Sequence, residues 1–281
     1  MKFMDALRAR EAAAPVWPPG AVAKAGKVPV APAVKSAYRT LAVLEYLGTT
    51  RSCTLGNMAE ALSIPKSSLH ALLRTMQACG WVETDQTGTF YHLGLRALLT
   101  GSAYVESDDI VTLSAPLLDQ IATRTGETVH LGRLDGANVI YLAKRESVHE
   151  LRMYSGIGRR LPAHATALGK ALLASLPGDE VNRRLQWPLA RLTPNTIVDR
   201  AALHEELRRA REQGYATDEG ENALDIHCVA VALTQPLPGV NAVSCSVPVS
   251  RATPATMLVA TAALRDSVSN LDSVIGSLRS R

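Results

Sequence analysis

Four apolar residues recur at helical spacing in the stretch 66–76. They stand at positions i, i+3, i+4 and i+7 and are Leu69, Leu72, Leu73 and Met76. Residues at this spacing lie on one stripe of an α-helix, and the stripe packs inward. The opposite side of the helix carries the polar residues Lys66, Ser67, Ser68, His70 and Arg74. The pattern therefore predicts an amphipathic helix with a polar and partly cationic outer face.

The segments on either side of this helix predict a compact unit around it. Residues 54–62 have the pattern of a short amphipathic helix, joined to the second helix by a tight turn. Gly80 ends the second helix, and residues 81–84 and 89–93 have the pattern of two strands around a turn. A helix, a turn, a second helix and a hairpin in this order predict a winged helix-turn-helix.

The polar side of the 66–76 helix has the chemistry of a DNA-reading surface. A helix with apolar packing behind it and phosphate or base ligands in front is what a major groove admits. No acidic residue occurs between Glu60 and Glu83, so nothing on this face repels phosphate. A generic helical core gives a similar stripe, and the hairpin directly after the helix is what favours DNA. The candidate DNA-binding residues are Lys66, Ser67, Ser68, His70, Arg74 and Tyr91.

Two further helices are expected beside this unit. One precedes it, with Ser36 as a candidate cap, Gly48 at its end, and an inward side made of Leu41, Leu44 and Leu47. The other spans 95–107 and links the small N-terminal part to the rest of the chain. Two DNA-reading units need a fixed separation, so a semi-rigid helix suits both a spacer and a dimer surface.

The second half of the chain mixes helical and strand patterns. Helices are expected at 115–125, 163–176, 200–213 and from 255 onward. Strands are expected at 127–134, 138–143, 228–234 and 240–247, with a turn at 236–239 between the last two and a further candidate strand at 151–155. Antiparallel strands interrupted by helices are typical of an α+β domain of the sensor type.

These patterns divide the chain into four parts. Residues 1–33 are rich in Ala, Pro and Lys and are expected to be a disordered extension rather than a signal peptide or a folded unit. Residues 34–95 form the winged helix-turn-helix, 96–112 the linker helix, and 113–281 the sensor-like domain.

Composition narrows the function classes. A hydrophobic fraction of 47% suffices for packed cores, and aromatic residues at 4% mean that aliphatic side chains build them. A net charge of +4 is compatible with a nucleic-acid partner. The four cysteines form no CxxC pair, which favours a reduced, cytoplasmic protein. The expected DNA binding would associate it with the nucleoid. No run of about 18 uncharged apolar residues predicts a membrane span.

Taken together, the segments resemble the IclR family of bacterial transcription regulators from about Val34 to about Ser277. The N-terminal motifs are Cys53-Thr-Leu55, Ile64-Pro-Lys-Ser-Ser-Leu-His70, Gly80-Trp-Val-Glu83 and Tyr91-His-Leu-Gly94. The C-terminal motifs are Leu161-Pro-Ala-His-Ala-Thr-Ala-Leu-Gly-Lys-Ala-Leu-Leu-Ala174, Arg211-Glu-Gln-Gly-Tyr-Ala-Thr-Asp218, Glu221, Cys228 and Ser244-Cys-Ser246. All of them occur in order and at the spacing of the family.

The resemblance implies a winged helix-turn-helix, a linker helix and a GAF-like effector-binding domain, assembled as a dimer or a dimer of dimers. It implies sequence-specific binding to operator DNA, modulated by a small organic acid or an aromatic catabolite. Members of the family include both repressors and activators. Cofactors are not part of this pattern.

The resemblance also implies a set of effector-binding residues. Small carboxylates are held in the family by an Asp, a Cys, two Ser and backbone groups at a helix start. The matching residues here, with two apolar neighbours, are Ala167, Leu168, Asp218, Cys228, Ser244, Ser246, Met153 and Ile226. Physically, Ser244 and Ser246 stand two apart on a strand and so face the same way. Without the resemblance they would be ordinary strand serines.

The chain departs from the family pattern at two positions. The family usually has Gly where this chain has Asp225, and Pro where it has Ala232. Asp225 adds a charge near the expected pocket, and Ala232 removes a fixed turn or strand edge. The departures bear on the identity of the effector rather than on the fold.

Two other readings compete with a DNA-binding regulator. One is an enzyme with a DNA-binding adaptor, in which Cys228 is the nucleophile and His164 or His227 its base. No nucleophile elbow, phosphate-binding glycine loop or HExxH motif supports it. The other is a metal-sensing repressor that uses His227, Cys228 and Asp218, although two adjacent residues on a strand point to opposite faces. His164 and Lys170 are expected to be structural, with Lys170 at the surface or capping a helix.

Overall fold

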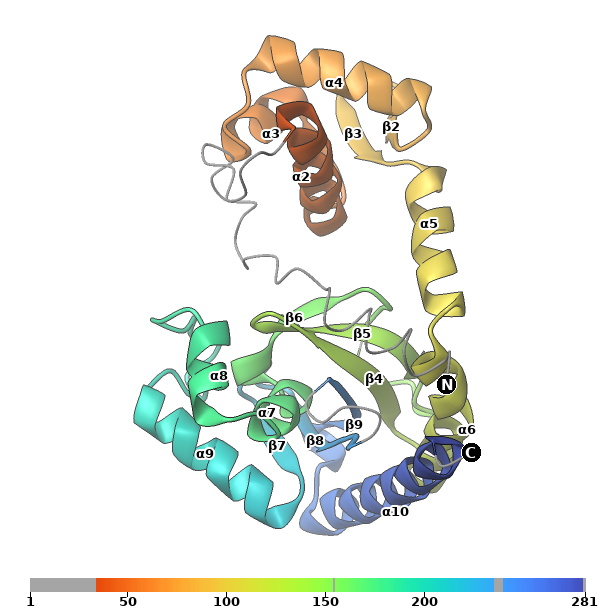
Figure 1. Ribbon diagram of the computed structural model, residues 1–281, viewed down its shortest axis with the longest axis vertical. Helices are drawn as coiled ribbons and strands as arrows, with labels where there is room; N and C mark the ends of the chain where they lie inside the picture. Colours follow the sequence, from red (N-terminus) through yellow and green to blue (C-terminus); the bar gives the residue numbers. More distant parts are fainter. Residues whose placement is uncertain (1–33, 154, 235–239, 280–281) are drawn as a thin grey trace. The chain divides into compact units, whose positions relative to one another are not determined.

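A computed structural model describes residues 34–153, 155–234 and 240–279 of the chain (Figure 1). The expected extension 1–33 and the expected turn 236–239 lie outside the described residues. The chain divides into two compact units, which meet between Ser107 and Asp108. Each unit encloses its own hydrophobic core, as separate domains do.

The N-terminal unit is built of helices and a small antiparallel sheet. Its described elements, in chain order, are α2 (Lys35–Thr50), β1 (Cys53–Thr54), α3 (Leu55–Ala61), α4 (Lys66–Ala78), β2 (Val82–Thr84), β3 (Phe90–Leu93) and α5 (Leu95–Glu106). β3 lies between β1 and β2, and β2 and β3 form a hairpin directly after α4. The predicted winged helix-turn-helix is confirmed, with α3 and α4 as the helix pair and the β2–β3 hairpin as the wing.

The apolar stripe predicted for α4 faces the core of this unit. Leu69 and Leu73 are completely buried and Met76 almost so, while Leu72 is half-buried. At the start of α3, the Thr54 side chain accepts a hydrogen bond from the backbone amide of Asn57 at 3.3 Å and caps the helix. Local periodicity and capping therefore account for the helix pair.

The helix before this pair differs from its prediction. It begins after Val34 with no side-chain cap, so Ser36 lies inside it, and it continues past Gly48 to Thr50. Leu41 is half exposed, at 50%. The buried residues of α2 are instead Tyr38, Ala42, Val43 and Leu47. The inward stripe is thus rotated relative to the predicted one, because smaller residues also pack against the core.

The C-terminal unit is an α+β domain around one antiparallel sheet. Its described elements are α6 (Asp109–Thr125), β4 (Thr128–Asp135), β5 (Asn138–Arg145), β6 (Arg160–Pro162), a 3-10 turn (Ala163–Ala165), α7 (Ala167–Ala174), α8 (Gly178–Arg184), α9 (Arg200–Gln213), β7 (Ala216–Glu219), β8 (Ile226–Ala232), β9 (Asn241–Pro248), a second 3-10 turn (Val249–Arg251) and α10 (Pro254–Arg279). The strands follow the order β6-β5-β4-β9-β8-β7. Among the helices described, none is long and apolar enough to span a membrane.

Helices cover both faces of this sheet (Figure 1). Successive strand residues point to opposite faces. On β9, Val243 and Cys245 belong to the core that the sheet shares with α6 and α10. Ala242 belongs to the core shared with α7 and α9, and Ser244 and Ser246 are in step with it. The two serines therefore lie on the α7 side of the sheet.

The predicted helix 163–176 is divided into two pieces. Thr166 has an extended backbone, with φ −129° and ψ 146°, and separates the 3-10 turn from α7. Gly169 explains the close approach of the two pieces, since a Cβ there would stand 2.1 Å from the carbonyl oxygen of Ala163.

The candidate strand 151–155 is also wrong, because its described residues form no strand. The patterns did not predict β6, β7 and α8.

Candidate functional site

The outer face of α4 exposes the polar residues that the sequence assigned to it. Its exposed residues are Lys66, Ser67, Ser68, His70 and Arg74. Within the described part of the chain, neither Lys66 nor Arg74 takes part in an ion pair, so both cations are available to an external partner. The face can therefore donate several hydrogen bonds and two positive charges to an acidic polymer.

Tyr91 does not belong to that face. Its side chain is 8% exposed and lies in the core of the N-terminal unit. On β3 it pairs with Cys53 on one side and Thr84 on the other, and the strand turns Phe90 outward instead. The proposed contact of Tyr91 with DNA is therefore corrected: a ring that packs in the core cannot reach a groove without unfolding the wing.

A second polar arrangement lies on the α7 side of the C-terminal sheet. Asp218 on β7 stands opposite Cys228 on β8, Cys228 opposite Ser246 on β9, and Ser246 opposite Thr128 on β4. In an antiparallel sheet, directly opposed residues share a face. One row of polar side chains thus crosses four neighbouring strands, of which β4 is distant from the other three in the sequence.

The neighbouring row is polar as well. It contains Ser244 on β9, which stands opposite His130 on β4, and His130 stands opposite Lys144 on β5. The His130 ring stacks on Tyr141 with centroids 4.3 Å apart, and its Nε2 atom lies 2.7 Å from the Ser155 hydroxyl. Burial lowers the pKa of His130 to about 3, so its ring is neutral. This row therefore places a neutral imidazole next to Ser244 on the α7 side of the sheet.

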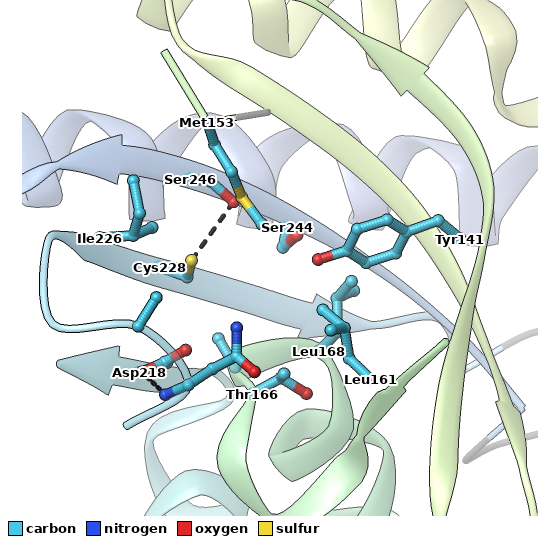
Figure 2. A pocket seen from close by; sticks show the side chains of 13 residues that line it. Tyr141, Met153, Leu161, Thr166, Leu168, Asp218, Ile226, Cys228, Ser244 and Ser246 are labelled. Carbon is cyan, nitrogen blue, oxygen red and sulfur yellow. Dashed lines mark hydrogen bonds between the residues drawn. The ribbon is translucent and has the colours of Figure 1, made fainter. Parts of the chain in front are cut away.

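The start of α7, together with the loop residue Met153, closes these rows into a cavity (Figure 2). The lining residues are Tyr141, Met153, Leu161, Thr166, Ala167, Leu168, Asp218, Asn222, Ala223, Ile226, Cys228, Ser244 and Ser246. All eight residues expected at an effector pocket are among them. The remaining lining residues escaped the sequence analysis, although the strand pattern around Tyr141 could have placed that ring on the same face.

The cavity is small, with about 20 Å³ of space for the centre of a water-sized atom. One such atom needs about 10–15 Å³ by this measure, so the cavity has room for a small polar head group and little more. Figure 2 shows the hydroxyl end of Tyr141 turned towards the serines and the Thr166 side chain on the α7 side.

The N-terminus of α7 is aimed at the cavity. The Thr166 side chain caps the helix by accepting a hydrogen bond from the amide of Gly169 at 3.1 Å. The amides of Ala167 and Leu168 belong to the first turn, where no carbonyl within the helix can accept them. Both residues line the cavity. First-turn amides of this kind favour a negatively charged group.

Asp218 is the buried acid of the cavity, at 3% exposure. Its Oδ1 atom accepts hydrogen bonds from the backbone amides of Glu221 at 2.7 Å and Asn222 at 3.4 Å. Burial raises the pKa of Asp218 to about 7, against the opposing effect of the Glu221 amide. The carboxyl therefore exists in both protonation states near neutral pH.

Lys170 is completely buried beside this acid, so its expected place at the surface or on a helix cap is wrong. Its ammonium group bonds to Glu206 at 3.0 Å and, more closely, to Glu221. Two carboxylates on α9 and on the loop after β7 thus hold the one cation. A lysine on a short helix gives no local signal of this burial, because its partners come from distant segments.

Cys228 has the surroundings of an inert thiol. Its Sγ atom lies 3.3 Å from the Ser246 hydroxyl, and burial raises its pKa well above the usual value. His164 is occupied elsewhere, 2.9 Å from the carbonyl of Ala190. In the described part of the chain, no group of three or more His, Cys, Asp or Glu residues is arranged to hold a metal ion.

A larger groove opens beside the cavity. It has a volume of about 480 Å³ and shares Met153, Asn222, Ala223 and Ile226 with the inner cavity. Its other lining residues include Leu151, Arg152, Arg159, Asp225 and Val249. Asp225, at which the chain departs from the family pattern, is therefore placed on this outer groove and not inside the cavity.

Comparisons with known proteins agree on one family. The model described as "Bacterial transcriptional regulator IclR C-terminal" matches residues 102–273, and the IclR helix-turn-helix domain matches residues 36–86. The chain is 38% identical over 202 residues to the HTH-type transcriptional regulator XynR of Escherichia coli strain K12, covering 71% of this chain and 80% of that protein.

Solved structures show the same fold. An IclR transcriptional regulator from Alicyclobacillus acidocaldarius has a TM-score of 0.75 at 28% identity, over 86% of this chain and 98% of that one. An IclR homologue from Microbacterium hydrocarbonoxydans, in complex with 4-hydroxybenzoate, has a TM-score of 0.70 at 23% identity, over 86% and 99% of the two chains. The family is one of transcriptional regulators rather than of enzymes.

Proposed function

This chain belongs to the IclR family of bacterial transcriptional regulators, and we propose that its inner cavity binds a small carboxylate that controls operator binding by α4. DNA binding through the helix-turn-helix and effector binding through the C-terminal domain are properties of this family. The proposal concerns which residues perform them and what the effector is.

The proposal rests on one observation, that residues from several segments of the chain line the same cavity. Eight residues from β7, β8, β9, the start of α7 and the loop before β6 line one cavity. Ser244, Ser246 and the first two residues of α7 all line it. Hydroxyls and helix-terminal amides hold a carboxylate without a full counter-charge. Met153 and Ile226 supply the apolar side.

The size of the cavity indicates how the effector is placed. Only the carboxylate end fits inside, because the space is about 20 Å³. The body of the acid extends past Met153 and Ile226 into the outer groove of about 480 Å³. Asp225 and the two arginines of that groove then contact its polar substituents. The homologue from Microbacterium hydrocarbonoxydans, whose complex contains 4-hydroxybenzoate, supports an acid of this class.

On the DNA side, we assign the contacts to the exposed face of α4. Lys66 and Arg74 provide charge, and Ser67, Ser68 and His70 provide hydrogen bonds to phosphates or base edges. Tyr91 is left out because it is buried. We propose three functional parts: a DNA-binding domain at 34–95, a linker helix at 96–112 and an effector-binding, GAF-like domain at 113–281.

The linker helix α5 is proposed as a contact between two copies of the chain, in a dimer or a dimer of dimers. None of its residues is buried. Its exposed large apolar residues are Leu95, Leu98, Leu99 and Tyr104. Apolar side chains grouped on one exposed helix mark an interaction surface. Two linked readers also gain operator affinity through effective concentration. The protein is proposed to work in the cytoplasm, at the nucleoid, because its operator lies there.

One experiment tests the proposal as a whole. Operator DNA is selected from a random duplex library with the full chain, and its binding is measured by fluorescence anisotropy with and without acetate, pyruvate and 4-hydroxybenzoate. We expect a palindromic site and a change in affinity of about 5–150-fold with at least one acid, the usual range of coupling between sites. Selection of no sequence refutes the reading face, and no response to any acid refutes the carboxylate effector.

A further inference from the structure

We propose that the inner cavity takes up its carboxylate together with one proton, which Asp218 holds and donates to the bound carboxylate as a hydrogen bond. This inference rests on the proposed effector site and specifies its ligand chemistry. The proton comes from solvent and stays shared between the two acids. The bound acid is thus recognised as half of a carboxyl–carboxylate pair.

The hydrogen bonds of Asp218 leave one oxygen for such a pair. Both backbone amides that bond to it, those of Glu221 and Asn222, use Oδ1. Within the described residues, Oδ2 accepts no hydrogen bond. Asp218 stands on β7, two strands away from Ser244 and Ser246 on β9, and all three residues line the cavity (Figure 2). A carboxylate held by the serines and by α7 therefore meets Oδ2.

The nearest cation is not available to neutralise two acids. Lys170 on α7 reaches Glu206 and Glu221, and no contact joins it to Asp218. Glu206 and Glu221 share that one ammonium group, so their two negative charges already exceed its single positive charge. The charge of Glu221 raises the pKa of Asp218 more than the charge of Lys170 lowers it, so a second negative charge in the cavity would be repelled by an ionised Asp218.

Three titratable groups on the neighbouring strands, Cys228, Tyr141 and His130, are neutral near neutral pH. Burial raises the pKa of the Cys228 thiol on β8 and of the Tyr141 phenol on β5. His130 on β4 is held neutral by burial, with a pKa of about 3. Lys144 on β5 is bonded to Ser155 and Glu146. Arg159, on the loop before β6, lines only the outer groove and lowers the pKa of Tyr141 slightly.

Two carboxyl groups forced into one small site share a proton, because both cannot be charged a few ångströms apart in a low-dielectric interior. Asp218 is already poised for this role, with a pKa of about 7 in the empty cavity. A proton is therefore acquired at little cost near neutral pH. The arrangement selects a monocarboxylate over a dianionic phosphate ester, for which one proton leaves excess charge.

The sign of the pH dependence follows. Below about pH 7, Asp218 is mostly protonated before binding and affinity is independent of pH. Above that value, a proton must be taken up with the ligand, and affinity falls by up to tenfold for each pH unit. If an ionised Asp218 did not repel the ligand, affinity would not fall with rising pH in this way.

The test is calorimetry of the full chain at pH 8 in two buffers with different ionisation enthalpies. The probes are acetate, pyruvate and 4-hydroxybenzoate. We expect the tightest of them to take up a substantial fraction of one proton per bound ligand, because Asp218 is largely ionised at pH 8 before binding. This measurement on the unmodified chain needs no variant to fold.

Two variants then locate the proton. Asp218→Asn keeps an acceptor for the two backbone amides and a permanent donor for the ligand, so binding should persist without proton uptake and without a pH slope. Glu219→Gln is the matched control, because Glu219 follows Asp218 on β7 but is exposed and lines neither the cavity nor the outer groove. It should keep both the uptake and the slope.

The outcomes separate the inference from the function on which it rests. Binding with no proton uptake by the unmodified chain overturns the inference and leaves the effector site standing. A pH slope that survives in Asp218→Asn places the proton on another group and also overturns it. If none of the three probes binds, the proposed carboxylate effector fails, and the inference fails with it.

Discussion

Charged side chains are exposed on the outer face of α4 but buried in and beside the cavity at the start of α7. On α4, Lys66 and Arg74 stand in solvent without a partner in the described chain. Under α7, Lys170 is completely buried between Glu206 and Glu221, and Asp218 lies 3% exposed. An exposed charge is nearly free of cost to the fold, whereas a buried one must be matched within the chain.

This difference indicates how each surface recognises its partner. A face of exposed cations meets a polyanion by releasing counterions, so its binding responds to salt. A closed cavity of neutral donors meets a small anion by desolvating it, so its binding responds to protonation and to single hydrogen bonds. We therefore expect one chain to hold a salt-sensitive surface and a pH-sensitive one.

The largest effect is expected on the exposed side, at the linker helix. Replacing both Leu98 and Leu99 by Glu, at 65% and 57% exposure, should separate the proposed dimer and lower operator affinity by about 10²–10⁴-fold through lost effective concentration. Light scattering and anisotropy measure the two changes. Leu258→Glu on α10, at 70% exposure, is the matched control. A monomer with unchanged operator affinity would refute the role of α5.

Lys170 and Lys66 allow a direct comparison of a buried cation with an exposed one. Lys170→Ala should destabilise the protein by about 3–5 kcal/mol, because it leaves Glu206 and Glu221 buried without their cation. Lys66→Ala should change stability by less than about 0.5 kcal/mol, because that side chain is exposed. Denaturant titration of both variants decides the matter. Equal stabilities would mean that the buried cluster is not a structural requirement.

The serine pair tests the cavity alone. Replacing Ser244 and Ser246 together by Ala should weaken binding of the carboxylate by a few kcal/mol at most, since each hydrogen bond to a charged group is worth about 1.5–3 kcal/mol. Operator affinity without acid should barely change. Calorimetry and anisotropy give both values. Unchanged acid affinity would place the ligand elsewhere, and joint loss of DNA binding and thermal stability would show that the serines support the fold.

The smallest expected effect belongs to single contacts of α4. Arg74→Ala and Lys66→Ala should each lower operator affinity, by about 1–3 kcal/mol for a base contact. For a phosphate contact, the slope of affinity against salt should decrease by about one unit. Anisotropy over a salt series measures both, with Arg183→Ala on α8 as an exposed control outside the reader. Wild-type behaviour of both variants would remove α4 from the groove.

The sequence predicted α4 well because everything that defines it is local. Leu69, Leu73 and Met76 recur at helical spacing, and the structure buries all three. The same logic failed for Leu41, which lies on the exposed side of α2, and for Tyr91, which β3 turns into the core. A short strand or a helix rich in small residues has more than one apolar face, and only packing selects between them.

Only part of the cavity could be predicted from the sequence. Alternation along β9 puts Ser244 and Ser246 on one face without further information. The resemblance to the family, and not spacing, brought in Asp218 and Cys228. The same resemblance could not supply the neutral His130 or the buried state of Lys170, which depend on side chains from other segments.

By itself, the sequence determined the helix pair with its cationic face, the main helices and strands of the second half, and the common strand face of Ser244 and Ser246. Tertiary structure decided which strands are neighbours, and hence the row in which Asp218, Cys228 and Ser246 meet. It also decided that Lys170 is enclosed by two acids and that Asp218 has no cation of its own. The reason is physical. Periodicity is a property of adjacent residues, whereas pairing, burial and protonation depend on groups that folding brings together from positions far apart in the chain.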